Sequence, residues 1–412
     1  MKSFAPLVLI CVAAGSVLAL AACLVDLSDL SGGSRDAGSA GGGGAGGLAA
    51  TTSEASTTMG IGGGATTSTA AATSSAGSAG NGGSGGDSTG CATPVLDCSA
   101  CACPAGGCAA VPLATGSDAD GPLGIAISSD GLFWVDKPAG RIMGILAKAS
   151  APQELAGINA PTAIAAASGR LFFTAQDGLW SCVLPGCNAS KKNYASPLAP
   201  GSIQGVAYDG GLVYWSDRGA NVNMGDGEVW RCDPANACAS PYLIANQQLL
   251  PKGLFLTTND LFWIAQGNGN ANGTVLRVPR TGVNPTVVTA ALTSPSGLAA
   301  DATYVYWTQA TAVGKILRCA YGAGYCDTPQ DVAPGASTLN LPIDAALAGG
   351  RIYWNDSGDG DIRSCPTPGC PAGQKPRIHA TGRQGVHRIA VGSSCLFWTD
   401  DVNGGTVDKM GR

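Results

Sequence analysis

The chain has 412 residues, of which 45% are hydrophobic and only 12% are charged, where about 25% charged is usual. Its formal net charge of −5 argues against a nucleic-acid partner, because such proteins carry a basic stripe that neutralises phosphates. The only two histidines, His379 and His387, exclude a multi-histidine metal site and disfavour histidine-based acid–base catalysis.

Residues 1–22 have the features of a secretory signal peptide, because Lys2 precedes the apolar run Leu7–Leu20. This run is short of the about 20 residues that a transmembrane helix needs. It ends in Leu-Ala-Ala-Cys23, which resembles the lipobox of bacterial lipoproteins. The resemblance implies cleavage before Cys23 and acylation of this residue, which would anchor the protein stably in a membrane. Leu24 favours the outer membrane of the cell envelope; the alternative is an ordinary signal peptide with an incidental cysteine.

Residues 23–90 are predicted to form the lipidated N-terminus and a flexible tether. From about residue 31 onward, the chain consists almost entirely of Gly, Ser, Ala and Thr. This segment has no hydrophobic period and cannot bury enough apolar surface to offset the entropy of ordering. A tether of this composition would reach on the order of 40 Å from the lipid surface.

Residues 91–108 form a cysteine-rich segment. It holds five cysteines within eighteen residues: Cys91, Cys98, Cys101, Cys103 and Cys108. Because the export signal predicts an oxidising compartment, disulfides are favoured over a metal site. We expect a small stapled segment at the edge of the following domain.

Residues 109–412 contain seven repeats, each marked by an aromatic pair in a short apolar run. The pairs recur at intervals of roughly 40–50 residues. They are Phe133-Trp134, Phe172-Phe173, Tyr214-Trp215, Phe262-Trp263, Tyr306-Trp307, Tyr353-Trp354 and Phe397-Trp398. A small-residue strand precedes each pair, and a Gly-x-apolar strand follows it. Four short strands per repeat predict an all-β fold, a seven-bladed β-propeller.

The fourth strand of each repeat is the weakest in the pattern. Its candidates are residues 153–158, 192–198, 242–246, 286–290, 331–333 and 377–381. The seventh repeat ends after its third strand, and the stretch Ala109–Thr115 resembles the missing one. We therefore predict that this stretch completes the seventh blade and closes the ring, which leaves no open sheet edge at the closure.

Four repeats continue the aromatic pair with a polar or apolar residue and an aspartate: Asp136, Asp217, Asp356 and Asp400. This pattern resembles the YWTD repeat of the low-density-lipoprotein-receptor class of propellers, over about 300 residues. Three repeats end otherwise, and that class has six blades, so a six-bladed ring is the alternative. The resemblance implies the architecture and not a ligand. The aromatic residues are expected in the core between blades.

Four repeats contain a cysteine pair that starts at the end of the third strand. We predict a disulfide in each: Cys182–Cys187, Cys232–Cys238, Cys319–Cys326 and Cys365–Cys370. Of the sixteen cysteines, the signal peptide takes Cys11 and lipid takes Cys23. The remainder are the five of the cysteine-rich segment and Cys395, so we expect Cys395 to bond one of the five, with the pairing open. In the chain-entropy model, a disulfide that closes such a long loop contributes roughly 4–5 kcal/mol to the free energy of unfolding.

The longest connections between second and third strands lie in the adjacent third and fourth repeats, at residues 216–226 and 264–272. Adjacent long loops on a rigid scaffold form a candidate binding patch. Its polar candidates are Asn221, Asn223, Asp226, Asn268, Asn270 and Asn272. The alternative is a pair of tolerated surface insertions.

A second candidate lies at the mouth of the central channel, where the innermost strands begin. Most of these strands begin with small residues, but the sixth and seventh carry Asp344 and Arg388, with His387 alongside, and Lys252 lies near the start of the fourth. Asp344 and Arg388 are predicted to pair across adjacent blades. The cluster is a structural ion pair, a ligand-reading group or a catalytic site.

A weaker candidate is Asp356, Asp359 and Asp361, whose carboxylates offer oxygen ligands for Ca²⁺. The alternative is a solvated turn, and no other cofactor is indicated.

Three functions remain open, because the fold alone does not decide between them. The first is a non-enzymatic, surface-tethered module that binds a protein or a glycan, and a long tether favours it. The second is a metal-dependent hydrolase or lactonase at the channel mouth, by analogy with propeller enzymes. The small residues at most channel strands argue against it. The third is a structural protein of the envelope.

Overall fold

The computed structural model describes residues 96–98, 110–195, 203–221, 223–335, 339–383 and 385–412. All of them belong to the compact unit Ser53–Arg412. The predicted signal peptide 1–22, Cys23, the tether 23–90 and four cysteines of the cysteine-rich segment lie outside the described residues. Within the described part of the chain, no helix is long and apolar enough to span a bilayer.

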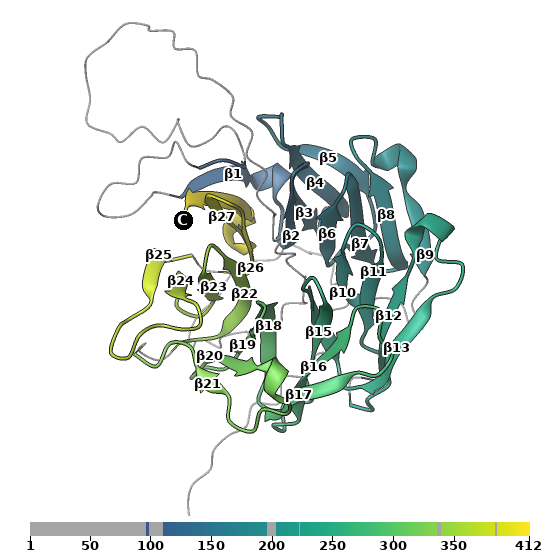
Figure 1. Cartoon of the computed structure of the whole chain (residues 1–412). Coiled ribbons are helices and arrows are strands. Elements are labelled where there is room, and N and C mark those ends of the chain that lie inside the picture. The colour runs from purple at the N-terminus through teal and green to yellow at the C-terminus, as the bar shows by residue number, and fades with distance from the viewer. Residues whose placement is uncertain (1–95, 99–109, 196–202, 222, 336–338, 384) are drawn as a thin grey trace, which may run out of the picture. The chain divides into compact units, whose positions relative to one another are not determined.

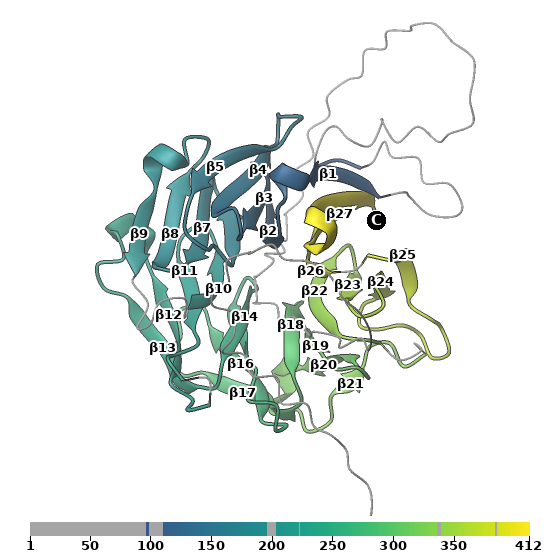
Figure 2. The ribbon, with the colours of Figure 1, turned by 180° about the vertical axis from the view of Figure 1, so that it is seen from behind.

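The described residues form seven antiparallel sheets of four strands each, arranged around a central axis (Figures 1 and 2). We number these blades in chain order and letter their strands a to d from the axis outward. The prediction of a seven-bladed β-propeller is confirmed, and the six-bladed alternative is wrong. The strands are short because tight turns at Asp, Asn and Gly separate the apolar runs.

The blades have the following strands. Blade 1 contains β2 (Pro122–Ser128), β3 (Gly131–Asp136), β4 (Arg141–Leu146) and β5 (Gln153–Gly157). Blade 2 contains β6 (Ile164–Ala167), β7 (Arg170–Ala175), β8 (Gly178–Val183) and β9 (Lys192–Ala195). Blade 3 contains β10 (Ile203–Tyr208), β11 (Val213–Asp217), β12 (Gly227–Cys232) and β13 (Tyr242–Gln248). Blade 4 contains β14 (Pro251–Leu256), β15 (Asp260–Ala265), β16 (Gly273–Pro279) and β17 (Thr286–Leu292).

Blade 5 contains β18 (Pro295–Ala300), β19 (Tyr304–Gln309), β20 (Lys315–Ala320) and β21 (Gln330–Asp331). Blade 6 contains β22 (Pro342–Ala348), β23 (Arg351–Asp356), β24 (Asp361–Pro366) and β25 (Arg377–Ala380). Blade 7 contains β26 (Val386–Val391), β27 (Cys395–Asp400), β28 (Thr406–Gly411) and β1 (Val111–Thr115). Short 3-10 turns are η3 (Gly116–Asp118), η4 (Asn188–Ser190), η5 (Pro234–Asn236), η6 (Tyr321–Ala323) and η7 (Val402–Gly404).

The ring closes through the N-terminal strand, as predicted. β1 pairs antiparallel with β28, in a register that runs from Val111 opposite Lys409 to Thr115 opposite Thr406. The first strand of the described domain therefore serves as strand d of the last blade. This pairing gives β28, which would otherwise be an open edge, a partner for its backbone groups.

A disulfide reinforces the closure. Cys98 bonds Cys395 at the start of β27, across 297 residues of sequence. The backbone N–H of Cys98 also donates to Ser394 Oγ at 2.9 Å. The expected bond between the cysteine-rich segment and the last blade is thus confirmed, and Cys98 is its partner.

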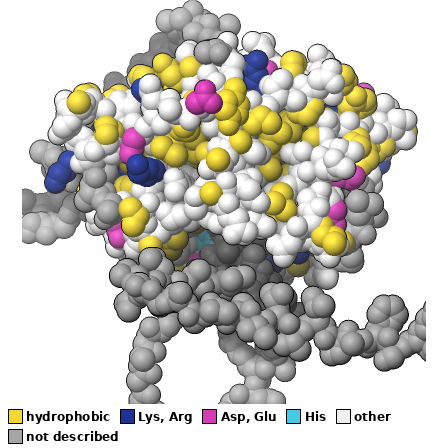
Figure 3. Space-filling model, turned by 90° about the horizontal axis from the view of Figure 1, so that it is seen from below, with side chains coloured by type: hydrophobic (Ala, Val, Ile, Leu, Met, Phe, Trp, Pro, Cys, Tyr) yellow, Lys and Arg dark blue, Asp and Glu magenta, His cyan; other side chains and the backbone are white. Residues whose placement is uncertain are grey.

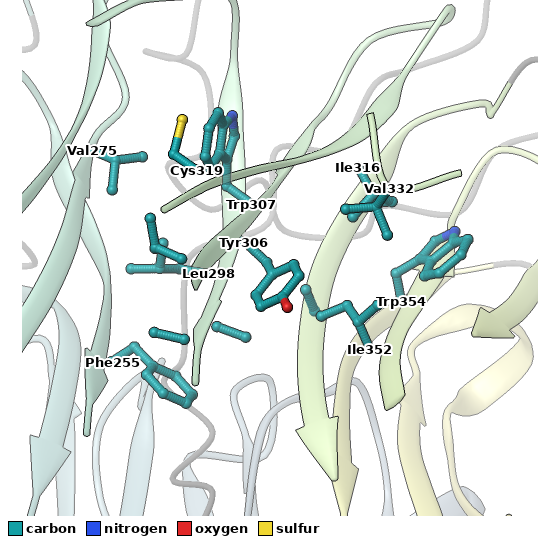
Figure 4. Packing of buried hydrophobic residues seen from close by; sticks show 14 of the residues in the cluster. Phe255, Val275, Leu298, Tyr306, Trp307, Ile316, Cys319, Val332, Ile352 and Trp354 are labelled. Atoms are coloured by element: carbon teal, nitrogen blue, oxygen red, sulfur yellow. The ribbon is translucent and has the colours of Figure 1, made fainter. Parts of the chain in front are cut away.

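The aromatic pairs form the core between blades, as predicted. Successive residues of a strand point to opposite faces of the sheet, so the two rings of a pair serve different neighbours. Trp134 packs with residues of blade 7, whereas Phe133 packs with residues of blade 2. Figure 4 shows the same arrangement around blade 5, where Tyr306 and Trp307 lie among the apolar residues of adjacent strands. Both are completely buried.

The four predicted disulfides within blades 2, 3, 5 and 6 are confirmed. Each disulfide cross-links a c–d loop that packs against the preceding blade. In blade 5, the N–H of Cys326 donates to the carbonyl of Val288 on β17 at 2.8 Å, and in blade 6 the N–H of Cys370 donates to Val332 O at 2.8 Å. These loops therefore cover part of an outer strand edge that would otherwise be exposed.

The outer parts of several blades, blades 4 and 5 among them, expose large apolar side chains. Val283 and Val287 of blade 4 are 49% and 43% exposed, and Tyr325 of blade 5 is 53% exposed. Viewed from below, the molecule shows a band of hydrophobic side chains with few charged ones among them (Figure 3). The low charged fraction of the sequence is therefore visible on the surface of the propeller.

Candidate functional site

The b–c loops and the d–a connections lie on one face of the propeller, and the a–b and c–d turns lie on the other. This follows from the sequential antiparallel order of strands a to d in each blade. We call the first the loop face and the second the turn face.

The long loop of blade 3 is held by its own last residue. Asp226 Oδ2 accepts hydrogen bonds from the N–H groups of Ala220 at 3.1 Å and Asn221 at 3.2 Å. Its carboxylate packs against Gly219, whose φ of +80° favours glycine and where a Cβ would collide with it. The loop is therefore a structured unit and not a slack connection.

The long loop of blade 4 is closed in the same way, by a side-chain oxygen of its last residue. Asn272 Oδ1 accepts a hydrogen bond from the N–H of Asn268 at 3.0 Å and packs against Gly267, whose φ is +78°. In both loops, the residue before the first glycine of strand c closes the turn. Asp226 and Asn272 thus shape their own loops. Asn221, Asn223, Asn268 and Asn270 are exposed, as is Asn272.

Met224 lies on the blade 3 loop and is 78% exposed, the largest value among the exposed large hydrophobic residues of the described chain. Val313 and Val402, on the b–c loops of blades 5 and 7, are 65% and 37% exposed on the same face. Sequence reasoning missed this methionine, although a lone large apolar residue inside a polar loop is a readable signal.

At the channel mouth, Asp344 and Arg388 lie at the boundary of blades 6 and 7. Asp344 Oδ2 accepts a hydrogen bond from the N–H of Ile389 on β26 at 2.9 Å. Burial raises the pKa of Asp344 to about 6, although the nearby positive charge of Arg388 opposes the rise. Asp344 thereby ties its own blade to the backbone of the next.

The remaining channel candidates do not all join this cluster. His387 Nε2 lies 2.7 Å from Asp401 Oδ2 in the b–c loop of blade 7, and Arg388 Nη1 donates to the carbonyl of His387 at 3.0 Å. Lys252 lies on β14 in blade 4, separated by blade 5 from Asp344. The structure therefore brings together Asp344 and Arg388, pairs the His387 side chain with Asp401, and places Lys252 elsewhere on the ring.

In blades 6 and 7, the polar residue after the aromatic pair bridges the inner strands of adjacent blades. In blade 6, Asn355 Oδ1 accepts from the N–H of Asp344 at 2.7 Å, and its Nδ2 donates to Val386 O of blade 7 at 2.6 Å. In blade 7, Thr399 Oγ1 donates to Leu123 O of blade 1 at 2.8 Å. The third position of the YWTD-like pattern therefore has a structural role between blades.

The predicted calcium ligands surround a guanidinium group. Arg363 contacts Asp361 at 2.7 Å, Asp359 at 3.5 Å and Asp356 at 3.6 Å. Burial raises the pKa of Asp356 to about 7, while Arg363 opposes the rise. In the described ranges, no three His, Cys, Asp or Glu side chains group in a way that could hold a metal ion. Arg363 therefore supplies the positive charge among these carboxylates.

Blade 6 also contains a serine–histidine contact that the sequence did not suggest. Ser364 Oγ lies 2.8 Å from His379 Nε2, and it accepts a hydrogen bond from Arg351 Nε at 3.0 Å. Burial lowers the pKa of His379 to about 4, so the imidazole is neutral at pH 7. Because Ser364 is completely buried, we interpret this network as a link between strands and not as a nucleophile.

These features define a β-propeller with structured loops on one face and a polar boundary at the channel. Comparison with known proteins agrees at the level of the fold. The chain is similar to a solved streptogramin B lyase (14% identity, 74% of this chain and 98% of that one, TM-score 0.57). It is also similar to a virginiamycin B lyase from Staphylococcus aureus with quinupristin (13% identity, 73% of this chain and 99% of that one, TM-score 0.56). A third similar structure is Kuenenia stuttgartiensis hydrazine synthase (14% identity, 71% of this chain and 96% of that one, TM-score 0.57).

Neither the protein-family models nor the curated proteins give a match to this chain. The structural similarities, at 13–14% identity, establish a shared propeller fold and carry no activity over to this chain. Its function must therefore be argued from its own side chains.

Proposed function

We propose that this protein is an exported, lipid-anchored propeller that binds a macromolecular ligand without catalysing a reaction. The ligand is a protein or a glycan, and it contacts the loop face at blades 3 and 4. The observation that carries the proposal is the pair of long, adjacent loops with the same internal closure, by Asp226 and Asn272. A binding loop that is already ordered loses less conformational entropy when it binds.

The exposed side chains on these loops fit a macromolecular surface. Asn223, Asn268 and Asn270 offer amide donors and acceptors. Met224 offers a flexible apolar contact, and methionine is enriched at protein interfaces. Because this methionine lies at an exposed position beside polar groups, a protein is the favoured partner and a glycan the alternative.

The anchored state belongs to the same proposal. The signal-like residues 1–22 and the lipobox ending at Cys23 support export and acylation, and residues 23–90 have the composition of a tether. The disulfides of the propeller fit an oxidising compartment outside the cytoplasm. We place the propeller in the bacterial cell envelope, anchored in the outer membrane, and regard the domain as YWTD-like.

The test compares three forms of the full chain in affinity capture from cross-linked cells. The parent is compared with a variant carrying Met224→Ser and Asn268→Ala and with a control carrying Val313→Ser on the neighbouring blade 5 loop. We expect a partner captured by the parent and the control but reduced at least tenfold with the loop variant. Melting temperatures should agree, because the substituted side chains are exposed.

A parallel arm incubates the same three proteins with isolated envelope polysaccharide, which detects a glycan ligand. Equal capture by the parent and the loop variant in either arm would contradict the assignment of the site. Failure of the parent to capture protein or polysaccharide would contradict the binding function itself.

A further inference from the structure

A second feature lies on the turn face, away from the loops that carry the proposed function. A hollow of about 370 Å³ opens between the turns of blades 3 and 4. Its volume lies within the range of roughly 300–1,000 Å³ that is typical of small-molecule sites. The lining side chains include Asp209, Thr258, Asn259, Arg280 and Thr281.

An ion pair across two blades fixes one wall of this hollow. The guanidinium of Arg280, from blade 4, contacts Asp209 Oδ2 in the a–b turn of blade 3. Arg280 Nη1 also donates to Thr258 O at 3.2 Å, and Asp209 Oδ1 accepts from the N–H groups of Gly211 and Leu212, each at 2.7 Å. Asp209 is therefore fully engaged, and its charge is paired with that of Arg280.

Arg231 supports the same wall from behind. Its guanidinium donates to the carbonyl of Arg280, and to those of Thr281 and Gly282 at 3.3 Å each. The hydroxyl of Tyr214 lies 3.4 Å from the carbonyl of Arg280. These contacts hold the turn after β16 in place, so the hollow is pre-formed.

Comparison with blade 5 shows how the turn beside the hollow differs from its equivalent in another repeat. Strand pairing places Tyr208 opposite Val213 in blade 3 and Ala300 opposite Val305 in blade 5, so the two turns are equivalent. Both begin with an aspartate near a tyrosine hydroxyl. At the two following equivalent positions, blade 5 has Thr303 and Tyr304, whereas blade 3 has Gly211 and Leu212. Smaller side chains thus leave the space open between blades 3 and 4.

The chemistry of the walls selects the ligand. The two charged side chains that line the hollow, Asp209 and Arg280, are already paired with each other. Arg231 does not line the hollow, and its guanidinium is engaged by backbone carbonyls. A charged ligand would therefore find no unpaired counter-charge in the lining, and burial of an unpaired charge is costly. The exposed Thr258 and Asn259, together with Thr281, offer hydroxyl and amide groups that both donate and accept hydrogen bonds. Leu212 adds a small apolar surface. We infer that this hollow binds a neutral, hydroxyl-rich molecule, namely a sugar unit.

The test uses the folded full chain and four named probes: glucose, galactose, mannose and N-acetylglucosamine. Each probe is titrated calorimetrically as the free monosaccharide and as a short oligosaccharide, which separates a free sugar from a unit of a polymer. Gly211→Thr introduces the residue that blade 5 carries at this position. Its Cβ would lie 3.4 Å from Asp209 Oδ1, an ordinary contact, so the fold should tolerate it.

We expect at least one probe to bind the parent, and we expect Gly211→Thr to weaken its affinity at least tenfold with an unchanged melting temperature. Asn259→Ala should also weaken binding because it removes a polar group of the wall. Thr303→Ala, in the equivalent turn of blade 5, is the matched control and should bind as the parent does.

Two results would overturn the inference: no binding of any probe by the parent, or equal affinity in the parent and Gly211→Thr. The loop variant of the proposed function distinguishes the two sites. Sugar binding lost with Met224→Ser and Asn268→Ala, but kept with Gly211→Thr, would assign the sugar to the loop face and refute the site described here.

Discussion

Asp344 shows how a single residue departs from its repeat for a structural purpose. Five other blades have Gly or Ala at this position of strand a, and blade 7 has Arg388. A Cβ would lie within 4 Å of atoms of the next blade at Gly205, Gly253 and Gly297. In blade 5, a Cβ at Gly297 would collide with the backbone of Asp344 itself. The carboxylate gains a hydrogen bond to Ile389 N–H but is buried, and burial disfavours its charged form.

The raised pKa of Asp344 predicts how stability depends on pH. The carboxyl binds its proton more tightly in the folded state, with a pKa of about 6, than in the unfolded state, where about 3.9 is usual. Its contribution to the free energy of unfolding is therefore present at low pH and lost as pH rises from about 4 through 6. Asp344→Asn, which resembles the protonated acid, should lose less stability between pH 4.5 and 7.5 than the parent does.

Urea unfolding at several pH values measures this difference. Asp356, whose pKa is raised to about 7, titrates in the same range in both proteins, so only the difference between parent and variant is informative. Identical slopes of stability against pH would show that Asp344 does not titrate in this way.

At the scale of strands, the polar residue after the aromatic pair connects inner strands that share no sheet in blades 6 and 7. Asn355 satisfies a backbone N–H in its own blade and a carbonyl in the next. Ser216 occupies the equivalent position in blade 3, and within the described chain its Oγ has no hydrogen-bond partner. The same position of the repeat therefore connects two blades through Asn355, bonds within its own blade through Thr308, and has no partner among the described residues at Ser216.

This contrast provides a matched pair of variants. Asn355→Leu should lower the free energy of unfolding by roughly 2–6 kcal/mol, because it leaves two buried backbone groups unsatisfied at about 1–3 kcal/mol each. Ser216→Ala should change it by less than about 1 kcal/mol. Denaturant unfolding of both proteins gives the comparison, and similar losses in the two would argue against a bridging role.

The strands themselves were predictable from the sequence, whereas several side-chain roles were not. The aromatic pairs and the glycines that open strand c place the seven repeats, because period-two burial and tight turns are local properties. β21 begins one residue earlier than predicted and is shorter, since packing against blade 6 and not local pattern limits it. The roles of Asp226 and Arg363 depend on backbone conformation and on contacts between strands that no linear pattern displays.

At the scale of the whole molecule, the ring is closed twice, by β1 on β28 and by Cys98–Cys395. Replacing both cysteines, with Cys98→Ala and Cys395→Ala, removes a closed loop of 297 residues and should cost up to roughly 5 kcal/mol in the chain-entropy model. Hydrogen exchange should accelerate first in β1 and β28, because they form the closure.

The matched control is Cys319→Ala with Cys326→Ala, which opens a loop of only 7 residues inside blade 5. It should cost about 2–3 kcal/mol and leave exchange in β1 unchanged. Equal exchange of β1 in the two double variants would show that the long disulfide does not secure the closure.

The position of Cys98 has a mechanical consequence for the proposed anchored state. Because Cys98 precedes β1 in the chain, a pull from the membrane side passes through the disulfide directly into β27. The hydrogen bonds between β1 and β28 then bear little of the load, and the closing strand is not peeled away. Blade 7, which would bear the load, lies across the ring from blades 3 and 4, so the loops proposed to bind the ligand would be spared distortion (Figure 1).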